Sequence, residues 1–136
     1  MKNYLFAYGT LAAPNAPSEI AATVKRLKCV GEGFIHGRLY DLGEYPGAVL
    51  SRQPADKVFG KIFELPADPE LLDRLDAYEG FEPQQPNKSL FIRKRTSIQR
   101  PNRDTLTGWV YEYNGNVRSE REIKNGQYSK LSADPR

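Results

Sequence analysis

The chain has 136 residues, of which 39% are hydrophobic and 27% charged, and its mean hydropathy is −0.64. A chain of this length buries enough surface to fold as one domain, residues 1–136, without disulfides or a structural metal. Its single cysteine, Cys29, excludes an internal disulfide and a zinc ribbon, and favours a reducing cytoplasm. The apolar run at residues 4–8 is too short for a signal peptide, and no stretch approaches the ~20 apolar residues of a membrane span.

The net charge is mildly positive, at +3, from 20 Lys and Arg against 17 Asp and Glu. Most of the excess lies in residues 93–95 and 100–103. A basic patch attracts phosphates, so an RNA- or phosphate-binding module is one open alternative. It would be built on Phe91, Arg93, Lys94, Arg95, Arg100 and Arg103. No recognisable RNA-binding motif accompanies these residues, and we therefore expect no nucleic-acid partner.

The first half of the chain predicts strands with one helix. Residues 2–8 form an apolar and aromatic run that stops at Gly9, as a central strand would. A turn-rich segment follows, and apolar residues at helical spacing predict a helix over residues 18–27. Residues 34–42 alternate in part and predict a second strand.

A turn and two further strands follow. Pro46-Gly47 fits the central pair of a type II turn, because Pro presets the first φ and Gly tolerates the positive second one. Residues 48–51 and 58–65 then continue the sheet.

The clearest helix spans residues 68–80. Asp68 suits the N-cap, Pro69 the first helical position, and Gly80 the left-handed residue that ends a helix. Strands over residues 89–99 and 105–113 follow a Pro-rich loop. The pattern predicts an α+β fold: a small, mostly antiparallel, barrel-like sheet of about six strands with two main helices.

The sequence lacks the residues that most known catalytic motifs require. His36 is the only histidine, so a two-histidine metal site and a Ser-His-Asp triad are excluded. Neither a P-loop nor a GxGxxG motif is present, which argues against ATP and dinucleotides. A carboxylate remains as the candidate chemical group.

Glu79 is that carboxylate. It directly precedes Gly80 at the C-terminal end of the predicted helix, where the macrodipole disfavours negative charge. It also follows Tyr78 of the apolar face, so we expect partial burial. Both effects raise the pKa toward the range of a general base. The alternative is an exposed glutamate at a frayed helix end.

A second candidate is Tyr8-Gly9-Thr10-Leu11, at the end of the first strand. Backbone N–H groups beside a glycine are open to a small anion such as a carboxylate. The alternative is a tight turn capped by Thr10.

Three segments together resemble the γ-glutamylcyclotransferase-like family, which includes γ-glutamylamine cyclotransferases and avirulence-induced-gene-like proteins. They are Tyr8-Gly9-Thr10-Leu11, residues 37–49 in the form G-x-L-Y-D-L-G-x-Y-P-G-A-V, and residues 75–80, L-D-A-Y-E-G. Phe91-Ile92-Arg93, residues 108–113 and residues 123–128 match later parts of the pattern. Phe91 stands where Tyr is usual, and Gln127-Tyr128 where Asp-Trp is common. These departures concern the rim of the pocket rather than the central glutamate.

The resemblance implies a barrel-like fold with a cavity at one mouth, and cyclisation of a small γ-glutamyl compound to 5-oxoproline with release of an amine or amino acid. Glu79 would be the general acid/base, and the backbone of Gly9, Thr10 and Leu11 would hold the α-carboxylate. Tyr8 and Tyr113 would line the pocket. Arg93 would pair with a substrate carboxylate or with Glu79, unless it is an exposed strand residue.

The resemblance implies no metal and no other cofactor, and we expect a cytoplasmic monomer with no membrane partner. A non-catalytic domain of the same fold that binds a small molecule is the alternative. The sequence does not distinguish among four substrates: γ-glutamyl amino acids, γ-glutamylamines, isopeptide-linked γ-glutamyl lysine and glutathione.

Overall fold

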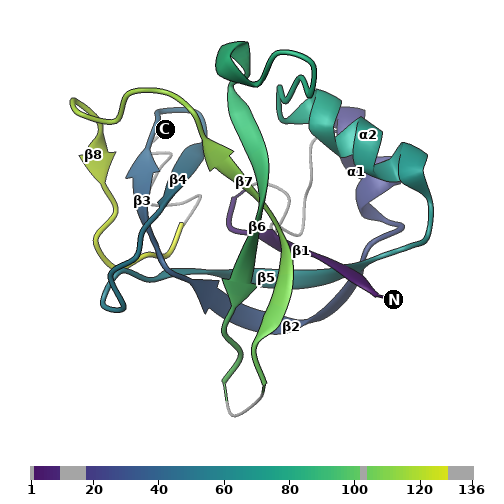
Figure 1. Cartoon of the computed structure of the whole chain (residues 1–136), viewed down its shortest axis with the longest axis horizontal. Coiled ribbons are helices and arrows are strands. Elements are labelled where there is room, and N and C mark those ends of the chain that lie inside the picture. Colours follow the sequence, from purple (N-terminus) through teal and green to yellow (C-terminus); the bar gives the residue numbers. More distant parts are fainter. Residues whose placement is uncertain (1, 10–17, 102–103, 129–136) are drawn as a thin grey trace.

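A computed structural model describes residues 2–9, 18–101 and 104–128. Within them the chain forms two α-helices, a short 3-10 helix and eight strands that belong to one curled sheet (Figure 1). The elements in chain order are β1 (Asn3–Ala7), α1 (Ser18–Val24), β2 (Lys28–Ile35), β3 (Gly37–Asp41), β4 (Pro46–Leu50), β5 (Val58–Leu65), α2 (Pro69–Tyr78), η2 (Pro86–Lys88), β6 (Phe91–Ile98), β7 (Leu106–Tyr113) and β8 (Arg121–Glu122).

The sheet is mixed but mostly antiparallel. Its strand order is β2-β5-β1-β7-β4-β3-β8, and β6 pairs with β7 off this path. The pairings of β7 with β1 and with β4 are parallel, and the others are antiparallel. The helices α1 and α2 lie side by side on one side of the sheet (Figure 1). The predicted α+β class with a curled sheet and two helices is confirmed.

Two strands, β1 and β4, pair with the same edge of β7, and the sheet divides between them. β6 pairs along the whole length of β7, so β1 and β4 both lie on the opposite edge. β1 pairs there through Leu5 and Trp109, whereas β4 pairs through Ala48 and Glu112. Because β1 ends at Ala7, the sheet separates into two arms at this point of β7.

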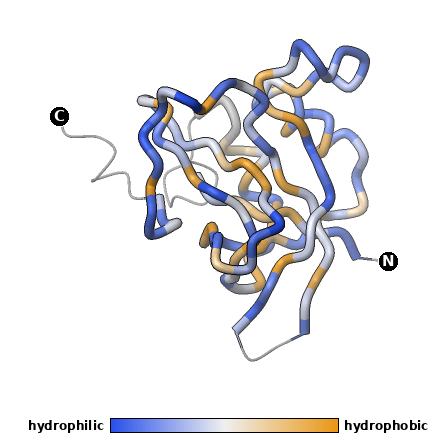
Figure 2. The backbone as a smooth tube through the Cα atoms, turned by 60° about the vertical axis from the view of Figure 1, so that its left-hand side comes forward, coloured by the Kyte–Doolittle hydropathy of each residue, from blue (hydrophilic) through white to orange (hydrophobic). Residues whose placement is uncertain are grey.

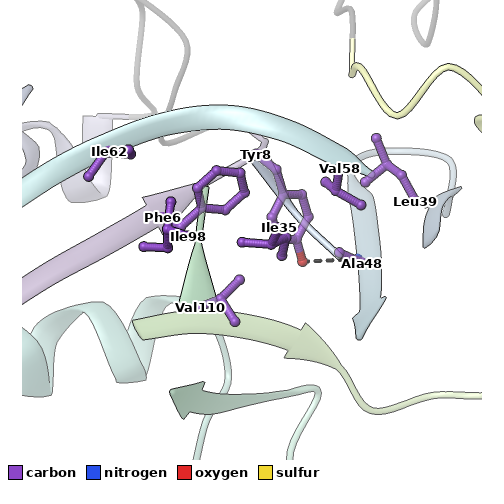
Figure 3. Packing of buried hydrophobic residues seen from close by; sticks show 9 residues of the cluster. All are labelled: Phe6, Tyr8, Ile35, Leu39, Ala48, Val58, Ile62, Ile98 and Val110. Carbon is purple, nitrogen blue, oxygen red and sulfur yellow. Dashed lines mark hydrogen bonds between the residues drawn. The ribbon is translucent and has the colours of Figure 1, made fainter. Parts of the chain in front are cut away.

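Each face of the sheet has its own hydrophobic core. One lies between the sheet and the helices and includes Leu71 and Leu75 of α2. The other fills the inside of the curl and is shown in Figure 3; its members are Phe6, Tyr8, Ile35, Leu39, Ala48, Val58, Ile62, Ile98 and Val110. Figure 2 shows apolar residues gathered along the central strands, with hydrophilic residues in the outer loops. The sheet is thus packed on both sides and holds the ends of its strands in fixed positions.

The ends of α2 follow from its sequence. The Asp68 side chain accepts a hydrogen bond from the Glu70 N–H at 3.1 Å, and Pro69 occupies the first turn, where no N–H is needed. Glu79 is the C-cap, and Gly80 follows with a φ of +72°. A glycine tolerates this left-handed conformation without strain. The predicted cap residues of this helix are confirmed.

The prediction of a type II turn at Pro46-Gly47 is wrong, because both residues begin β4. The turn lies earlier, where the Leu42 N–H donates to the Tyr45 carbonyl at 3.0 Å and Gly43 has a φ of +102°. Gly47 is needed for space instead. A Cβ there would lie 2.7 Å from Leu42 Cδ1 and 2.9 Å from Tyr113 Cβ.

Helix α1 ends at Val24 rather than at residue 27. The other differences concern strands. The predicted strand over residues 34–42 is divided between β2 and β3, and β2 begins already at Lys28. The glycines at the start of β2 interrupt the alternating pattern of a strand, and Gly31 lies at an irregularity in the pairing with β5. The two-residue strand β8 has no pattern of its own to reveal it.

Candidate functional site

A cavity of about 340 Å³ lies where β1 and β4 separate along β7. Five parts of the chain line it: β1 with the two residues after it, the turn before β4, the C-terminal end of α2, the start of β6, and β7. The lining residues are Leu5, Phe6, Ala7, Tyr8, Gly9, Glu44, Tyr45, Pro46, Tyr78, Glu79, Leu90, Phe91 and Tyr111. The volume is in the range of small-molecule sites.

Glu79 reaches this cavity from the end of α2. Its backbone N–H caps the helix on the Leu75 carbonyl at 2.9 Å, and the left-handed Gly80 then turns the chain away. The side chain forms no ion pair within the described residues. Burial removes water from the carboxylate and raises its pKa from 4.5 to about 7. A carboxyl group with this pKa takes up and returns a proton near neutral pH.

The Tyr8 hydroxyl joins the two arms of the sheet beside Glu79. It donates a hydrogen bond to the Tyr111 carbonyl at 2.6 Å and accepts one from the Ala48 N–H at 3.0 Å. Figure 3 shows the ring extending from the end of β1 to Ala48 in β4. The hydroxyl thus takes the place of a main-chain group between β7 and β4. Burial raises the Tyr8 pKa, so the phenol stays neutral.

Arg93 forms an ion pair with Asp76 and does not line the cavity. Its Nε donates to Asp76 Oδ1 at 2.8 Å and its Nη2 to Oδ2 at 3.3 Å, and the guanidinium lies 4.3 Å from the centre of the Trp109 ring. The Tyr111 hydroxyl donates to Asp76 Oδ1 at 2.6 Å. Asp76 is 4% exposed. The structure therefore brings Arg93 close to the cavity but outside its lining, held by a buried carboxylate.

The other predicted residues fall into three groups. Gly9 lines the cavity, and a Cβ there would lie 3.0 Å from Pro46 Cγ, so the chain passes closely here. Thr10 and Leu11 lie outside the described residues. Tyr113 is one layer removed from the cavity, because its ring packs at 5.6 Å on that of Phe91, which is part of the lining.

Sequence reasoning missed four polar lining residues: Glu44, Tyr45, Tyr78 and Tyr111. A signal for Tyr111 was present, since it lies two residues before Tyr113 on the same face of a strand. Glu44 and Tyr45 lie within residues 37–49, a segment that carries part of the family resemblance but from which no site residue was predicted.

The described residues show no group of three or more His, Cys, Asp or Glu side chains suited to a metal ion. Neither described α-helix is long and apolar enough to cross a membrane.

The comparisons with known proteins agree with this architecture. The sequence matches the family described as "Gamma-glutamyl cyclotransferase, AIG2-like" over residues 5–130. A comparison with curated proteins finds no match.

Among solved structures, an AIG2-like protein from Mus musculus is 18% identical, with a TM-score of 0.71 over 95% of this chain and 89% of that one. The protein ytfP from Escherichia coli is 25% identical, with a TM-score of 0.62 over 95% and 98% of the two chains. A structure titled "Gamma-glutamyl cyclotransferase" is 15% identical, with a TM-score of 0.59 over 90% of this chain and 70% of that one. The fold and the sequence match together show that the chain belongs to the γ-glutamylcyclotransferase, AIG2-like, family.

Proposed function

We propose that the protein is a γ-glutamylcyclotransferase-type enzyme that converts a γ-glutamyl amine or amino acid into 5-oxoproline and a free amine. The observation that carries the proposal is Glu79, a desolvated carboxyl group with a pKa of about 7 in a cavity large enough for a γ-glutamyl group. The family assignment supports the same reaction class.

In the proposed reaction the Glu79 carboxylate takes a proton from the substrate's α-ammonium group. The neutral nitrogen then attacks the γ-carbonyl carbon, and a C–N bond closes the five-membered ring. Glu79 returns its proton to the leaving nitrogen as the original amide C–N bond breaks. The α-nitrogen loses a second proton on becoming a lactam N–H, and the free amine takes up one proton from solvent, so charge and protons balance.

The shape of the site supports an intramolecular reaction. Nucleophile and electrophile belong to one molecule, so a cavity that folds the glutamyl chain back on itself supplies much of the rate increase. Tyr8 and Tyr111 are linked to each other and to Asp76 by short hydrogen bonds, and they give the cavity a rigid wall beside Glu79. Such preorganised walls hold a reactive conformation without being rearranged during the reaction.

The α-carboxylate needs a partner that is neutral, because no Lys, Arg or His belongs to the described lining. We assign this role to the backbone N–H groups of Gly9, Thr10 and Leu11, of which Gly9 lies at the cavity. Arg93 then acts indirectly, through Asp76, and Tyr113 supports Phe91.

The experiment measures 5-oxoproline, free amine and glutamate released from γ-glutamyl amino acids and γ-glutamylamines. Cyclisation predicts equal amounts of 5-oxoproline and amine and no glutamate. A substrate with an acetylated α-amine is the control, since its nitrogen cannot become the nucleophile and no amine should appear. Release of glutamate would indicate a hydrolase. Binding of the compounds without any release would favour the alternative of a non-catalytic small-molecule binding domain of the same fold.

A further inference from the structure

Tyr111 of β7 is hydrogen bonded to two parts of the cavity wall that lie on different elements. Its main-chain carbonyl accepts a hydrogen bond from the Tyr8 hydroxyl, directly after β1, at 2.6 Å. Its own hydroxyl donates to Asp76 Oδ1 on α2, also at 2.6 Å. Tyr111 is 4% exposed, so both hydrogen bonds are shielded from water. One residue of the sheet therefore holds both the end of β1 and the last turn of α2.

Asp76 fixes the end of α2 with its main chain as well as with its side chain. Its carbonyl accepts the Phe81 N–H at 2.8 Å, and the Gly80 N–H donates to the Ala77 carbonyl at 3.2 Å. These two hydrogen bonds form the Schellman motif that closes many helices. Glu79 is the C-cap inside this motif, so its backbone moves together with that of Asp76.

The Tyr111 hydroxyl contributes a hydrogen bond to this helix end, and no charge. Asp76 Oδ1 also accepts a hydrogen bond from Arg93 Nε at 2.8 Å, so the carboxylate is held from two neighbouring strands, β6 and β7. Burial and the hydrogen bond to Asp76 raise the pKa of Tyr111, so the phenol stays neutral and keeps its proton. That proton is directed at Asp76 and is not available to a ligand.

In the proposed function, Glu79 takes a proton from the α-ammonium group while the backbone at Gly9 holds the α-carboxylate. Both groups are attached to the α-carbon, so these two parts of the site must keep a fixed spacing. Tyr111 is bonded on one side to the residue before Gly9 and on the other to the helix that carries Glu79. We propose that Tyr111 is a positioning residue, which acts through Asp76 to hold Glu79 at a fixed distance from the anion-binding backbone. This role rests on the proposed function.

The variant Tyr111→Phe removes only the hydroxyl, and its substrates are γ-glutamyl-alanine and γ-glutamyl-butylamine. We expect kcat for 5-oxoproline release to fall about tenfold or more, because a displaced general base loses its alignment with the α-nitrogen. The dissociation constant of either compound should stay within about twofold, since the hydroxyl proton does not reach the substrate. The acid limb of the pH profile should stay in place, because the variant removes no charge.

Ser51→Ala is the matched control. The Ser51 hydroxyl also donates to an aspartate, Asp56 Oδ2, at 2.7 Å, and both residues lie outside the described lining. This variant loses the same kind of hydrogen bond and should keep the kcat of the wild type below its unfolding transition. Equal kcat in Tyr111→Phe and Ser51→Ala would overturn the role of Tyr111. A higher dissociation constant with unchanged kcat would also overturn it, since the hydroxyl would then bind substrate.

Amide hydrogen exchange tests the same role without turnover. In the wild type the Gly80 and Phe81 N–H groups should exchange slowly, although helix ends usually fray. In Tyr111→Phe their exchange should become roughly tenfold faster, as expected for the loss of one hydrogen bond, while that of Ile62 in β5 stays unchanged. Fast exchange in the wild type, or unchanged exchange in Tyr111→Phe, would overturn the role of Tyr111 even if 5-oxoproline is released. If the wild type releases none, the proposed function fails, and the exchange rates still decide whether Tyr111 holds the end of α2.

Discussion

Arg93 binds Asp76 through two guanidinium nitrogens, at 2.8 and 3.3 Å, and Asp76 lies three residues before Glu79 on α2. Positions three apart on a helix are neighbours, with Cβ atoms about 5–6 Å apart. Arg93 of β6 is thus neutralised by one carboxylate. The next carboxylate along the helix, Glu79, lines the cavity and has no ion pair among the residues that the structure describes. We infer that Asp76 preserves the raised pKa of Glu79 by holding Arg93.

The substitution Asp76→Asn tests this relationship. It removes the carboxylate that pairs with Arg93. An uncompensated opposite charge within about 4–6 Å lowers a carboxyl pKa by roughly 1–3 units. The acid limb of the kcat/KM profile should therefore move from about pH 7 to lower pH by at least about one unit. The measurement is 5-oxoproline release against pH.

The double variant Asp76→Asn with Arg93→Met is the control, since it removes both charges. Its acid limb should return toward that of the wild type, although both variants are destabilised. An unchanged acid limb in a folded Asp76→Asn variant would contradict the inference.

Glu79 also makes the stability of the fold depend on pH. Its pKa is 4.5 in the unfolded chain and about 7 in the folded one, so the folded state binds the extra proton between these values. The contribution is fully present below about pH 4.5 and is lost as pH rises through 7. Relative to Glu79→Gln, the wild type should lose roughly 3 kcal/mol of unfolding free energy between pH 4.5 and 8. Urea unfolding of both proteins across this range measures the difference, and parallel stability curves would show that Glu79 is not desolvated.

Removal of the Tyr8 hydroxyl should weaken the junction between the two arms of the sheet. In Tyr8→Phe the Ala48 N–H and the Tyr111 carbonyl lose their partner, and a buried unsatisfied group costs about 1–3 kcal/mol. Thermal or urea unfolding gives the loss. Tyr4→Phe in the same strand is the control, because the Tyr4 hydroxyl makes no hydrogen bond within the described residues. Equal effects of the two substitutions would show that the bridging hydrogen bonds add nothing.

Gly80→Ala should disturb Glu79 as well as the fold. The residue has a φ of +72°, and a Cβ there would lie 3.1 Å from Leu90 Cβ, so we expect backbone strain of about 1–2 kcal/mol and a shift of the neighbouring glutamate. Gly43→Ala is the control. Gly43 has a φ of +102°, but nothing lies within 4 Å of an added Cβ, so this variant has the backbone strain without the steric contact. Lower kcat in Gly80→Ala than in Gly43→Ala, at matched temperature below both unfolding transitions, is the expected result. Equal kcat values would show that Leu90 does not restrain the end of α2.

The sequence predicts the parts of this protein whose signals are local. The caps of α2, the first strand before Gly9, and the position of Glu79 at a helix terminus follow from residues only a few positions apart. The place of Pro46-Gly47 in strand β4, rather than in a turn, could not be predicted in this way. Gly47 is required by Leu42 and Tyr113, and the second of these lies far away in the sequence.

Distance along the sequence also explains why the partners of the site residues were not predicted. Asp76 and Arg93 are 17 residues apart, on α2 and β6, so only the packing of the helix on the sheet shows that they form a pair. The partners of Tyr8 lie 40 and 103 residues away, and they depend on the divergence of β1 and β4 along β7. Patterns along one chain segment identify reactive residues, whereas their partners are set by the topology.

The most direct test of the central claim is kcat for 5-oxoproline release by the wild type and by Glu79→Gln, with substrate binding measured separately. If Glu79 is the general acid/base, kcat should fall by about 10²–10⁴-fold while the dissociation constant stays within a few-fold. If kcat stays within about tenfold and the dissociation constant rises instead, Glu79 is a binding residue and the proposed mechanism is wrong.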